Sequence, residues 1–293
     1  MANVSARPLA EARRAEALAS TLPPLMVAAE RVAATVAQGV HGRRRVGQGD
    51  SFWQFRPFVA GDATMQIDWR QSAKSDRAFV RETEWEAAQT VCLWRDGSAS
   101  MRWRSRAAPV EKRERAGLLL LALASLLMRG GERVALIEQT ARPVWGRAGL
   151  DRMAEGLIRS DDDGTGLPPR TNLPRHAKVV LFSDFLSPLE EVHATIGRLA
   201  ATPVSGHLLQ VLDPAEILLP YKGRIRFLGL EHETDTLISR VEGVREEYEK
   251  RLVAHQEGLA AIAGAAGFTF SIHRTDHGPE TALLGLYMSL APE

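Results

Sequence analysis

From residue 88 onward, short apolar runs alternate with longer segments of helical pattern, and this alternation limits the possible folds more than any other feature of the chain. The runs at 90–94, 178–182 and 207–212 are mostly apolar, as is typical of strands that are covered on both faces. Segments of helical length separate them, which favours parallel strands joined by helices. We therefore predict an α/β fold over residues 88–293, with a mostly parallel sheet and helices on both faces.

The same patterns predict the remaining elements of this region. Further strands are expected at 133–138, 142–145, 224–230 and 268–272, and helices at 111–129, 150–159, 188–201, 239–265 and 280–290. The helix at 111–129 is apolar nearly all round, so we expect it to be buried. Gly130 and Gly131 directly follow it and are typical of a helix end.

Two segments with different patterns precede this region. Residues 1–40 carry helical spacing that is interrupted at Pro23 and Pro24, so we expect a helical segment there. Residues 41–87 are rich in Trp and Phe, and the stretch 78–84 alternates like a strand. We therefore divide the chain into a helical segment (1–40), a β-rich lead-in (41–87) and the main α/β domain (88–293).

Composition excludes several classes of protein. The formal net charge is +1 over 293 residues, which gives no global field for nucleic acid or acidic membranes. The single cysteine, Cys92, excludes an internal disulfide and a cysteine-based zinc site, and it fits a reducing compartment. The longest strongly apolar stretch, 117–128, is too short to span a bilayer, and no signal-peptide order is present. We expect a cytoplasmic protein without a membrane anchor.

A polar turn follows the first strand of the main domain. Asp96, Ser98 and Ser100 are two residues apart, just past the strand's carboxyl end, where open α/β sheets place ligand sites. Their hard oxygen atoms suit Mg²⁺. The alternative is an ordinary turn, since Asp accepts local backbone hydrogen bonds and Gly97 tolerates a positive φ. The pattern predicts a magnesium-type site, with the ordinary turn left open.

This turn resembles the first metal-binding segment of a von Willebrand factor A domain. Such a site takes its other ligands from a threonine loop and from an aspartate that follows a later strand. The resemblance implies Thr165 and Asp184 as those ligands, with Thr171 as a competitor for Thr165. Asp184 also has a simpler interpretation, as an acidic residue near a helix N-terminus.

The lead-in is similar to the signature of the DUF58 family. The matching segments are 52–62 and 67–74, and Asp213-Pro214-Ala215-Glu216 matches a later motif. The resemblance covers residues 40–290 approximately and implies a von Willebrand A-like domain. It also implies a MoxR-type AAA+ ATPase as partner and a role in chaperone-like assembly or maturation of client proteins. Within the signature we expect structural roles, in a folded polar cluster, for Arg56, Gly61, Asp62, Asp68 and Trp69.

Arg95 departs from the family pattern, which usually has an apolar residue before the key aspartate. An inward-pointing Arg95 would replace the metal electrostatically and leave the site metal-free. Arg102 and Trp103 directly follow the polar turn. A tryptophan flanked by arginines is typical of an interface anchor. We therefore predict that Arg95, Arg102 and Trp103 form a partner-binding rim beside the site.

These observations favour a non-enzymatic adaptor, in which an acidic side chain of a partner completes the coordination of Mg²⁺. A metal-dependent phosphoester hydrolase is the alternative, but the chain lacks a P-loop, an H-E-x-x-H motif and a G-x-S-x-G motif. Nucleic-acid binding is a second alternative, through Arg43–Arg45 and the arginines around Trp103. The near-neutral net charge weighs against it.

Overall fold

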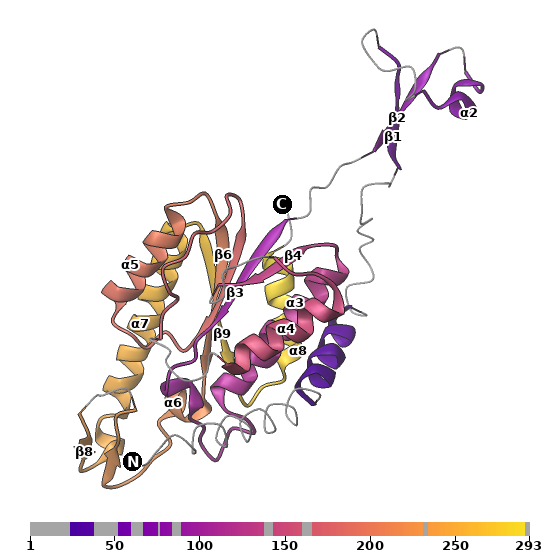
Figure 1. The fold of residues 1–293 in the computed structure, drawn as a ribbon. Helices are drawn as coiled ribbons and strands as arrows, with labels where there is room; N and C mark the ends of the chain where they lie inside the picture. Colours follow the sequence, from indigo (N-terminus) through magenta and orange to yellow (C-terminus); the bar gives the residue numbers. More distant parts are fainter. Residues whose placement is uncertain are drawn as a thin grey trace, which may run out of the picture. The chain divides into compact units, whose positions relative to one another are not determined.

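The structure, a computed structural model, describes residues 24–37, 52–59, 67–75, 77–83, 89–137, 143–159, 166–230 and 234–290. The chain divides into two compact units (Figure 1): a small unit of residues 41–88, and a main unit of residues 1–40 and 89–293. In the small unit, β1 (Phe52–Pro57) pairs antiparallel with β2 (Phe79–Thr83), and a short helix, α2 (Trp69–Ser72), lies between them in sequence.

A five-stranded parallel sheet forms the centre of the main unit. Its strands are β3 (Thr90–Arg95), β4 (Arg133–Leu136), β5 (Lys178–Ser183), β6 (Ser205–Leu212) and β9 (Phe268–Arg274). They lie in the order β4-β3-β5-β6-β9, and every neighbouring pair is parallel. The predicted α/β fold is confirmed. The strand order reverses between β3 and β5, so the crevice at their carboxyl ends is the place where such sheets bind ligands.

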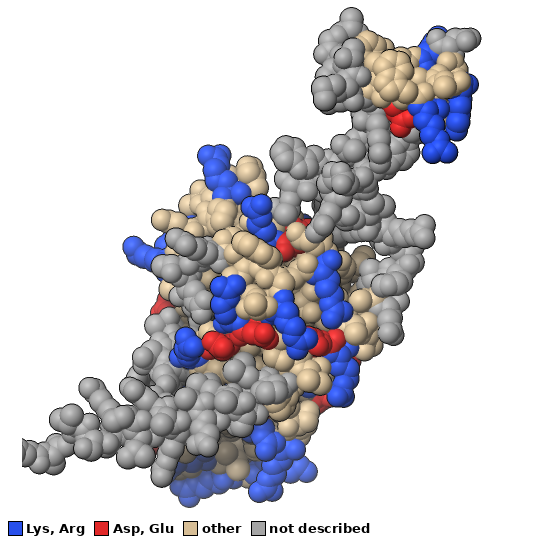
Figure 2. Space-filling model, turned by 45° about the vertical axis from the view of Figure 1, so that its right-hand side comes forward, with Lys and Arg blue, Asp and Glu red and all other residues tan. Residues whose placement is uncertain are grey.

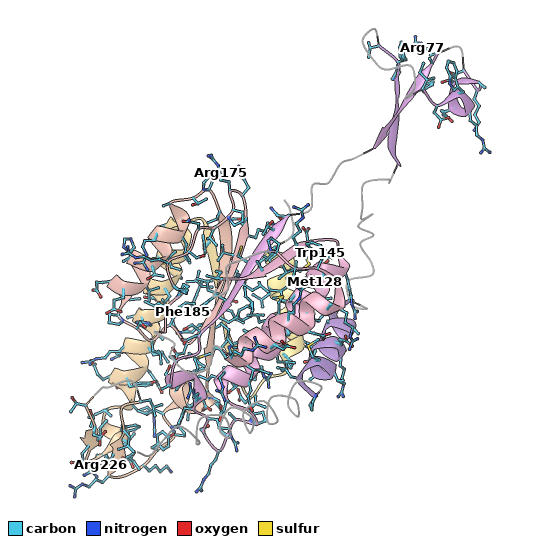
Figure 3. All side chains as sticks on the ribbon, viewed as in Figure 1. Arg77, Met128, Trp145, Arg175, Phe185 and Arg226 are labelled. Atoms are coloured by element: carbon cyan, nitrogen blue, oxygen red, sulfur yellow. The ribbon has the colours of Figure 1, made fainter. Side chains whose placement is uncertain are left out.

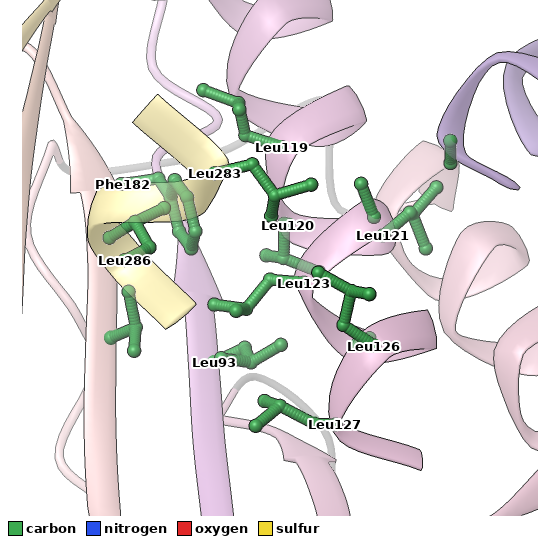
Figure 4. Close-up of a cluster of buried hydrophobic side chains, with 14 of the residues drawn as sticks. Leu93, Leu119, Leu120, Leu121, Leu123, Leu126, Leu127, Phe182, Leu283 and Leu286 are labelled. Atoms are coloured by element: carbon green, nitrogen blue, oxygen red, sulfur yellow. The ribbon is translucent and has the colours of Figure 1, made fainter. Parts of the chain in front are cut away.

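Helices cover both faces of this sheet (Figure 1). One face carries α3 (Lys112–Arg129), α4 (Gly146–Arg159), α8 (Pro279–Ser289) and the helix at 24–37; the other carries α5 (Leu189–Ala200) and α7 (Arg245–Ala265). Neighbouring residues of β3 pack into the hydrophobic cores on opposite faces of the sheet, because side chains alternate along a strand. Leu93 joins the core with α3 (Figure 4), whereas Trp94 joins the core with α5 and α7.

The helix α3 is buried along most of its length, as its composition predicts. The side chains of Glu111 and Glu114 close a capping box at its start, and Gly130 follows its last residue. Two charged residues in its first turn, Lys112 and Arg115, are buried with the leucines. Among the described residues, no helix is long and apolar enough to cross a membrane.

The helix at 24–37 packs into the main core through its apolar face, which includes Met26, Ala29 and Val32. The preceding residues 1–23, the first part of the predicted helical segment, lie outside the described residues.

Three predicted elements differ in the structure. Within the described part of 142–145, the expected strand is a single bridge between Val144 and Val134. The segment 224–230 contributes only β7 (Ile225–Phe227), which pairs antiparallel with β8 (Thr236–Ile238) as a hairpin. The long helix predicted from residue 239 begins at Arg245, because a 3₁₀ turn at Val241–Gly243 precedes it.

Candidate site at the carboxyl edge of the sheet

The polar turn lies at the carboxyl end of β3, at the point where the strand order reverses. Asp96 is fully buried. Its Oδ1 accepts a hydrogen bond from the Ser98 amide at 2.7 Å, and its Oδ2 accepts one from the Ser183 hydroxyl at 2.6 Å. Burial raises the pKa of Asp96, and the charge of Asp184 raises it further. Both carboxylate oxygens of Asp96 therefore accept hydrogen bonds.

Asp184, at the end of β5, meets this turn through Ser100. The Ser100 hydroxyl donates to Asp184 Oδ2 at 2.7 Å, and the Ser98 and Ser100 hydroxyl oxygens are 3.1 Å apart. The other Asp184 oxygen accepts from the Leu186 amide at 3.3 Å. The structure thus brings together four of the five residues that the sequence nominates as metal ligands.

The cation at this cluster is Lys112, in the first turn of α3. Its Nζ donates to Asp184 Oδ2 at 2.8 Å and also to the Glu216 carboxylate. Only 1% of Lys112 is exposed. Burial lowers the pKa of Lys112, but the carboxylates of Asp184 and Glu216 more than offset this and hold it above its ordinary value. The ammonium group is therefore charged.

The Asp213–Glu216 motif explains how Glu216 reaches this lysine. Asp213 ends β6 and caps α6 (Pro214–Leu218), while the Glu216 carboxylate accepts from the Asp213 amide at 2.8 Å. The Tyr248 hydroxyl, on α7, donates to the Glu216 carbonyl. Burial raises the pKa of Glu216. We call Asp96, Lys112, Asp184 and Glu216 the buried charge cluster.

The buried charge cluster has oxygen donors of the kind that Mg²⁺ prefers, but their arrangement does not fit a divalent ion. All four carboxylate oxygens of Asp96 and Asp184 accept hydrogen bonds. A tethered ammonium already occupies Asp184 Oδ2. A second cation beside a buried ammonium meets both repulsion and desolvation. In the described part of the chain, no three or more His, Cys, Asp or Glu residues are grouped to hold a metal.

The two threonine candidates occupy different places. Thr165 lies outside the described residues, but its neighbour Gly166 is at the cluster, since the Ser183 hydroxyl is 3.4 Å from the Gly166 carbonyl. Thr171 instead lines a groove with Thr195 and Arg198, from the second half of α5. Because α5 starts near Asp184 and runs away from it, Thr171 is not at the cluster.

Arg95 is not a rim residue. It is 5% exposed, and its guanidinium donates to the Leu157 carbonyl of α4 at 2.8 Å. The guanidinium also lies against Gly117 of α3, so it is directed toward the helices on one face of the sheet. Arg102 is exposed and Trp103 is half-buried, and their role in a partner-binding rim stays a prediction.

Two chain segments at this edge carry exposed positive charge. One, at 97–110, follows β3, and the other, at 217–230, begins in the last turn of α6. The Ser105 amide donates to Asp213 Oδ2 at 2.7 Å, which ties the first segment to the start of α6. Neither 97–110 nor 217–230 contains an acidic residue. Lys and Arg side chains are visible at the lower end of the main unit, as they are elsewhere on the same face (Figure 2), and Arg226 is labelled at the lower end in Figure 3. We define the basic edge as the exposed residues Arg102, Arg104, Arg106, Lys222, Arg224 and Arg226.

Phe185, directly after Asp184, has a left-handed backbone with φ of 48°. This conformation is costly for a bulky residue and persists only when the surroundings impose it. Here the ring is fully buried, the Phe185 amide donates to the Ser183 hydroxyl at 2.9 Å, and the His255 ring donates to the Phe185 carbonyl at 2.7 Å. Packing from α7 therefore holds the backbone that positions Asp184.

The signature residues of the small unit are described only in part. Asp68 caps α2, accepting from the Gln71 amide at 2.9 Å. Within the small unit Trp69 is 69% exposed, and its expected place in a folded polar cluster stays a prediction. The side chain of Arg56 and the residues Gly61 and Asp62 lie outside the described part of the chain.

Similar proteins are found in mycobacteria and among solved structures. Uncharacterized proteins of Mycobacterium tuberculosis and Mycobacterium bovis are 26% identical over 278 residues, covering 88% of this chain and 85% of each relative. An aerotolerance-related membrane protein from Bacteroides fragilis, solved with multiple mutations to serines, covers 69% of this chain and 98% of its own, at 14% identity and a TM-score of 0.37. The conserved hypothetical protein BatB from Bacteroides thetaiotaomicron gives 15% identity, a TM-score of 0.35, and coverage of 69% and 97%.

A family model matches residues 54–258, which include all but the first two residues of the lead-in signature, the polar turn and the Asp213–Glu216 motif. The family is described as a protein of unknown function, DUF58. The match spans well over half of the chain. The chain therefore belongs to the DUF58 family.

Proposed function

We propose that this protein is a non-enzymatic adaptor that docks a partner protein on its basic edge. The family resemblance points to a MoxR-type AAA+ ATPase as that partner, and to assembly or maturation of other proteins as the shared task. The observation that carries the proposal is the exposed positive charge on two segments at one edge of the sheet, 97–110 and 217–230, which contain no acidic residue. Such a surface complements an acidic patch on a partner and raises the rate of encounter.

The buried charge cluster supports an adaptor rather than an enzyme. Asp96, Asp184 and Lys112 are buried, and the lysine binds the carboxylates of Asp184 and Glu216. A general acid or base, in contrast, must reach its substrate within hydrogen-bond distance. In this proposal the cluster therefore stabilises the carboxyl edge of the sheet and does not catalyse a reaction.

Apolar side chains beside the cations favour a protein partner over a nucleic acid. Leu228 and Leu230, next to Arg226, are at least half exposed, and Trp103 lies between two arginines of the basic edge. Apolar and aromatic anchors surrounded by polar residues are typical of protein interfaces. The partner surface that fits is acidic with an apolar centre.

The test is a pull-down from native lysate with the tagged chain and two charge-reversal variants. One variant carries Arg102→Glu and Arg104→Glu; the other carries Arg224→Glu and Arg226→Glu. The matched control reverses Arg170 and Arg175, which are exposed but precede β5, at the opposite edge of the sheet. Figure 3 shows Arg175 and Arg226 at opposite ends of the main unit.

We expect the wild type and the control to retain an AAA+ ATPase, and each basic-edge variant to retain about tenfold less, as for loss of a central charged contact. Equal retention by all four proteins would sink the proposal. Loss of retention after nuclease treatment would instead favour nucleic-acid binding. Steady phosphoester turnover by the wild type, abolished in Asp96→Ala, would favour the hydrolase alternative.

The magnesium dependence expected from the sequence stays a prediction, and the same assay includes it. Retention only in Mg²⁺, lost in EDTA and in Asp96→Ala, would support the metal-bridged contact.

A further inference from the structure

We propose that the ammonium group of Lys112 is the built-in cation of this site and takes the place that a divalent ion would otherwise fill. The inference goes beyond the docking role, because it concerns what neutralises the carboxylates and not what binds outside them. It also replaces Arg95, the residue that the sequence suggests as a substitute cation.

The contacts of the lysine are those of a site cation. Its Nζ binds the same Asp184 oxygen that receives the Ser100 hydroxyl, and it also binds Glu216. Through Ser100 and Ser98 the same network reaches the turn that holds Asp96. One positive group therefore joins the ends of β3, β5 and β6, as a metal with ligands from three segments would.

The position of Lys112 in its helix supports this interpretation. It is the first residue of α3, where the helix dipole disfavours a positive charge. Its side chain is also buried, which costs further free energy unless the charge is paired. A surface-facing lysine would avoid the cost of burial, and solvent and salt would screen its interaction with the helix dipole. The carboxylates of Asp184 and Glu216 offset these free-energy costs. We infer that Lys112 lies at this position because it pairs with those carboxylates.

Glu216 explains why a single lysine suffices. A monovalent ammonium near Asp96 and Asp184 alone would have no direct partner beyond Asp184. The Asp213–Glu216 turn brings a third carboxylate onto the other side of the Nζ atom. Removal of the ammonium would leave two buried carboxylates, the half-buried Glu216 carboxylate and two hydroxyls without a cation. Oxygen donors of this kind suit Mg²⁺ or Mn²⁺.

The test is a Mn²⁺ titration followed by electron paramagnetic resonance, which reports free Mn²⁺. It compares the wild type, Lys112→Met and Lys178→Met. Lys178 is the matched control because it is also buried, at 9% exposure, but donates to the Leu290 carbonyl, away from the cluster. The double variant Lys112→Met with Asp96→Asn shows whether any bound ion uses the cluster.

We expect no saturable Mn²⁺ binding at millimolar concentration in the wild type and in Lys178→Met. Lys112→Met should bind one ion, at least about tenfold more tightly, because its carboxylates lack a counter-charge. The double variant should lose that ion. A folded Lys112→Met that binds Mn²⁺ no better than the wild type overturns the proposal.

The wild-type titration decides the matter by itself if Lys112→Met does not fold. One Mn²⁺ bound per wild-type chain, and lost in Asp96→Asn, would show that a divalent ion holds the site beside the lysine and would overturn the proposal. Absence of binding, with an unfolding midpoint equal in Mg²⁺ and in EDTA, supports it. Neither readout involves a partner, so the docking proposal stands or falls separately.

Discussion

The buried charge cluster and the basic edge lie at the same end of the same sheet, yet the surroundings of their charged side chains are opposite. In the cluster, Lys112 is buried and bound to Asp184 and Glu216. In the basic edge, six cations face solvent and the two segments contain no acid. Charge that is internally matched holds a structure together, whereas exposed charge of one sign attracts a partner. The comparison separates the residues that stabilise the fold at this edge from the residues that we propose to bind a partner protein.

The largest expected effect is on the buried side of this comparison. Lys112→Met removes one partner of a buried ion pair and leaves carboxylates uncompensated, so we expect a loss of about 3–5 kcal/mol in the free energy of unfolding. Urea denaturation measures it, with Lys178→Met as the control. A loss no greater than in the control would show that the cluster is not a support.

The pH dependence of the free energy of unfolding shows whether the cluster or other buried groups make the fold sensitive to acid. Burial lowers the pKa of His207 to about 4, and burial together with Arg115 lowers that of His273 to about 4. Both rings are neutral in the folded chain. Between pH 6.5 and pH 4 the unfolded chain binds protons that the folded chain does not, so stability falls as pH falls, by about 2 kcal/mol per histidine near pH 5.

Two carboxyl groups of the cluster, those of Asp96 and Glu216, have the opposite effect on the pH dependence of stability. The raised pKa values of Asp96 and Glu216 mean that the folded chain binds protons more readily than the unfolded chain, so acid does not destabilise the fold through them. Replacement of His207 and His273 by Gln should therefore flatten the pH dependence of urea unfolding from pH 6.5 to 4. An unchanged slope would assign the acid sensitivity elsewhere.

A smaller loss is expected from Asp96→Ala. The carboxylate satisfies the Ser98 amide and the Ser183 hydroxyl, and leaving buried donors without acceptors costs about 1–3 kcal/mol. Thermal or urea unfolding measures the loss, and Asp96→Asn, which keeps one acceptor, should lose less. Equal losses in the two variants would mean that charge, rather than hydrogen bonding, is the contribution of Asp96.

The smallest effect should come from the exposed side. Arg224→Glu with Arg226→Glu should change the free energy of unfolding by less than about 0.5 kcal/mol, because exposed substitutions away from special contacts are nearly neutral. The same variant is expected to lose partner binding. A large loss of stability in it would remove the distinction between support and binding surface.

The sheet could be predicted because its strands are apolar runs of the length that a doubly covered sheet demands. Strand β5, at Lys178–Ser183, is buried throughout, and a sequence such as Val-Val-Leu-Phe has few other options. The strand β8 could not be predicted in this way. It has three residues, Thr236–Ile238, and is a strand because it pairs with β7, not because its own sequence has a strand pattern.

The meeting of the polar turn with Asp184 could also be predicted, since the carboxyl ends of parallel strands share one edge. Lys112 could not, because a lysine in the first turn of a helix normally extends into water. The Asp213–Glu216 motif does not indicate it either, because the pairing of Glu216 with a lysine 104 residues away leaves no pattern in the local sequence. Arg95 was the nearer candidate in sequence, but its place on β3 directs it to α4.

The contacts of Lys112 also bear on the order in which the chain folds. Its carboxylate partners are 72 and 104 residues away along the chain. A contact of such long range forms only when β5 and β6 are already aligned, after the entropy of closing those loops has been lost. We therefore expect Lys112→Met to speed unfolding and to leave the refolding rate nearly unchanged, which stopped-flow kinetics would show as a low φ-value. In that case the lysine acts as a late latch, which governs how long the native state lasts rather than how fast it is reached.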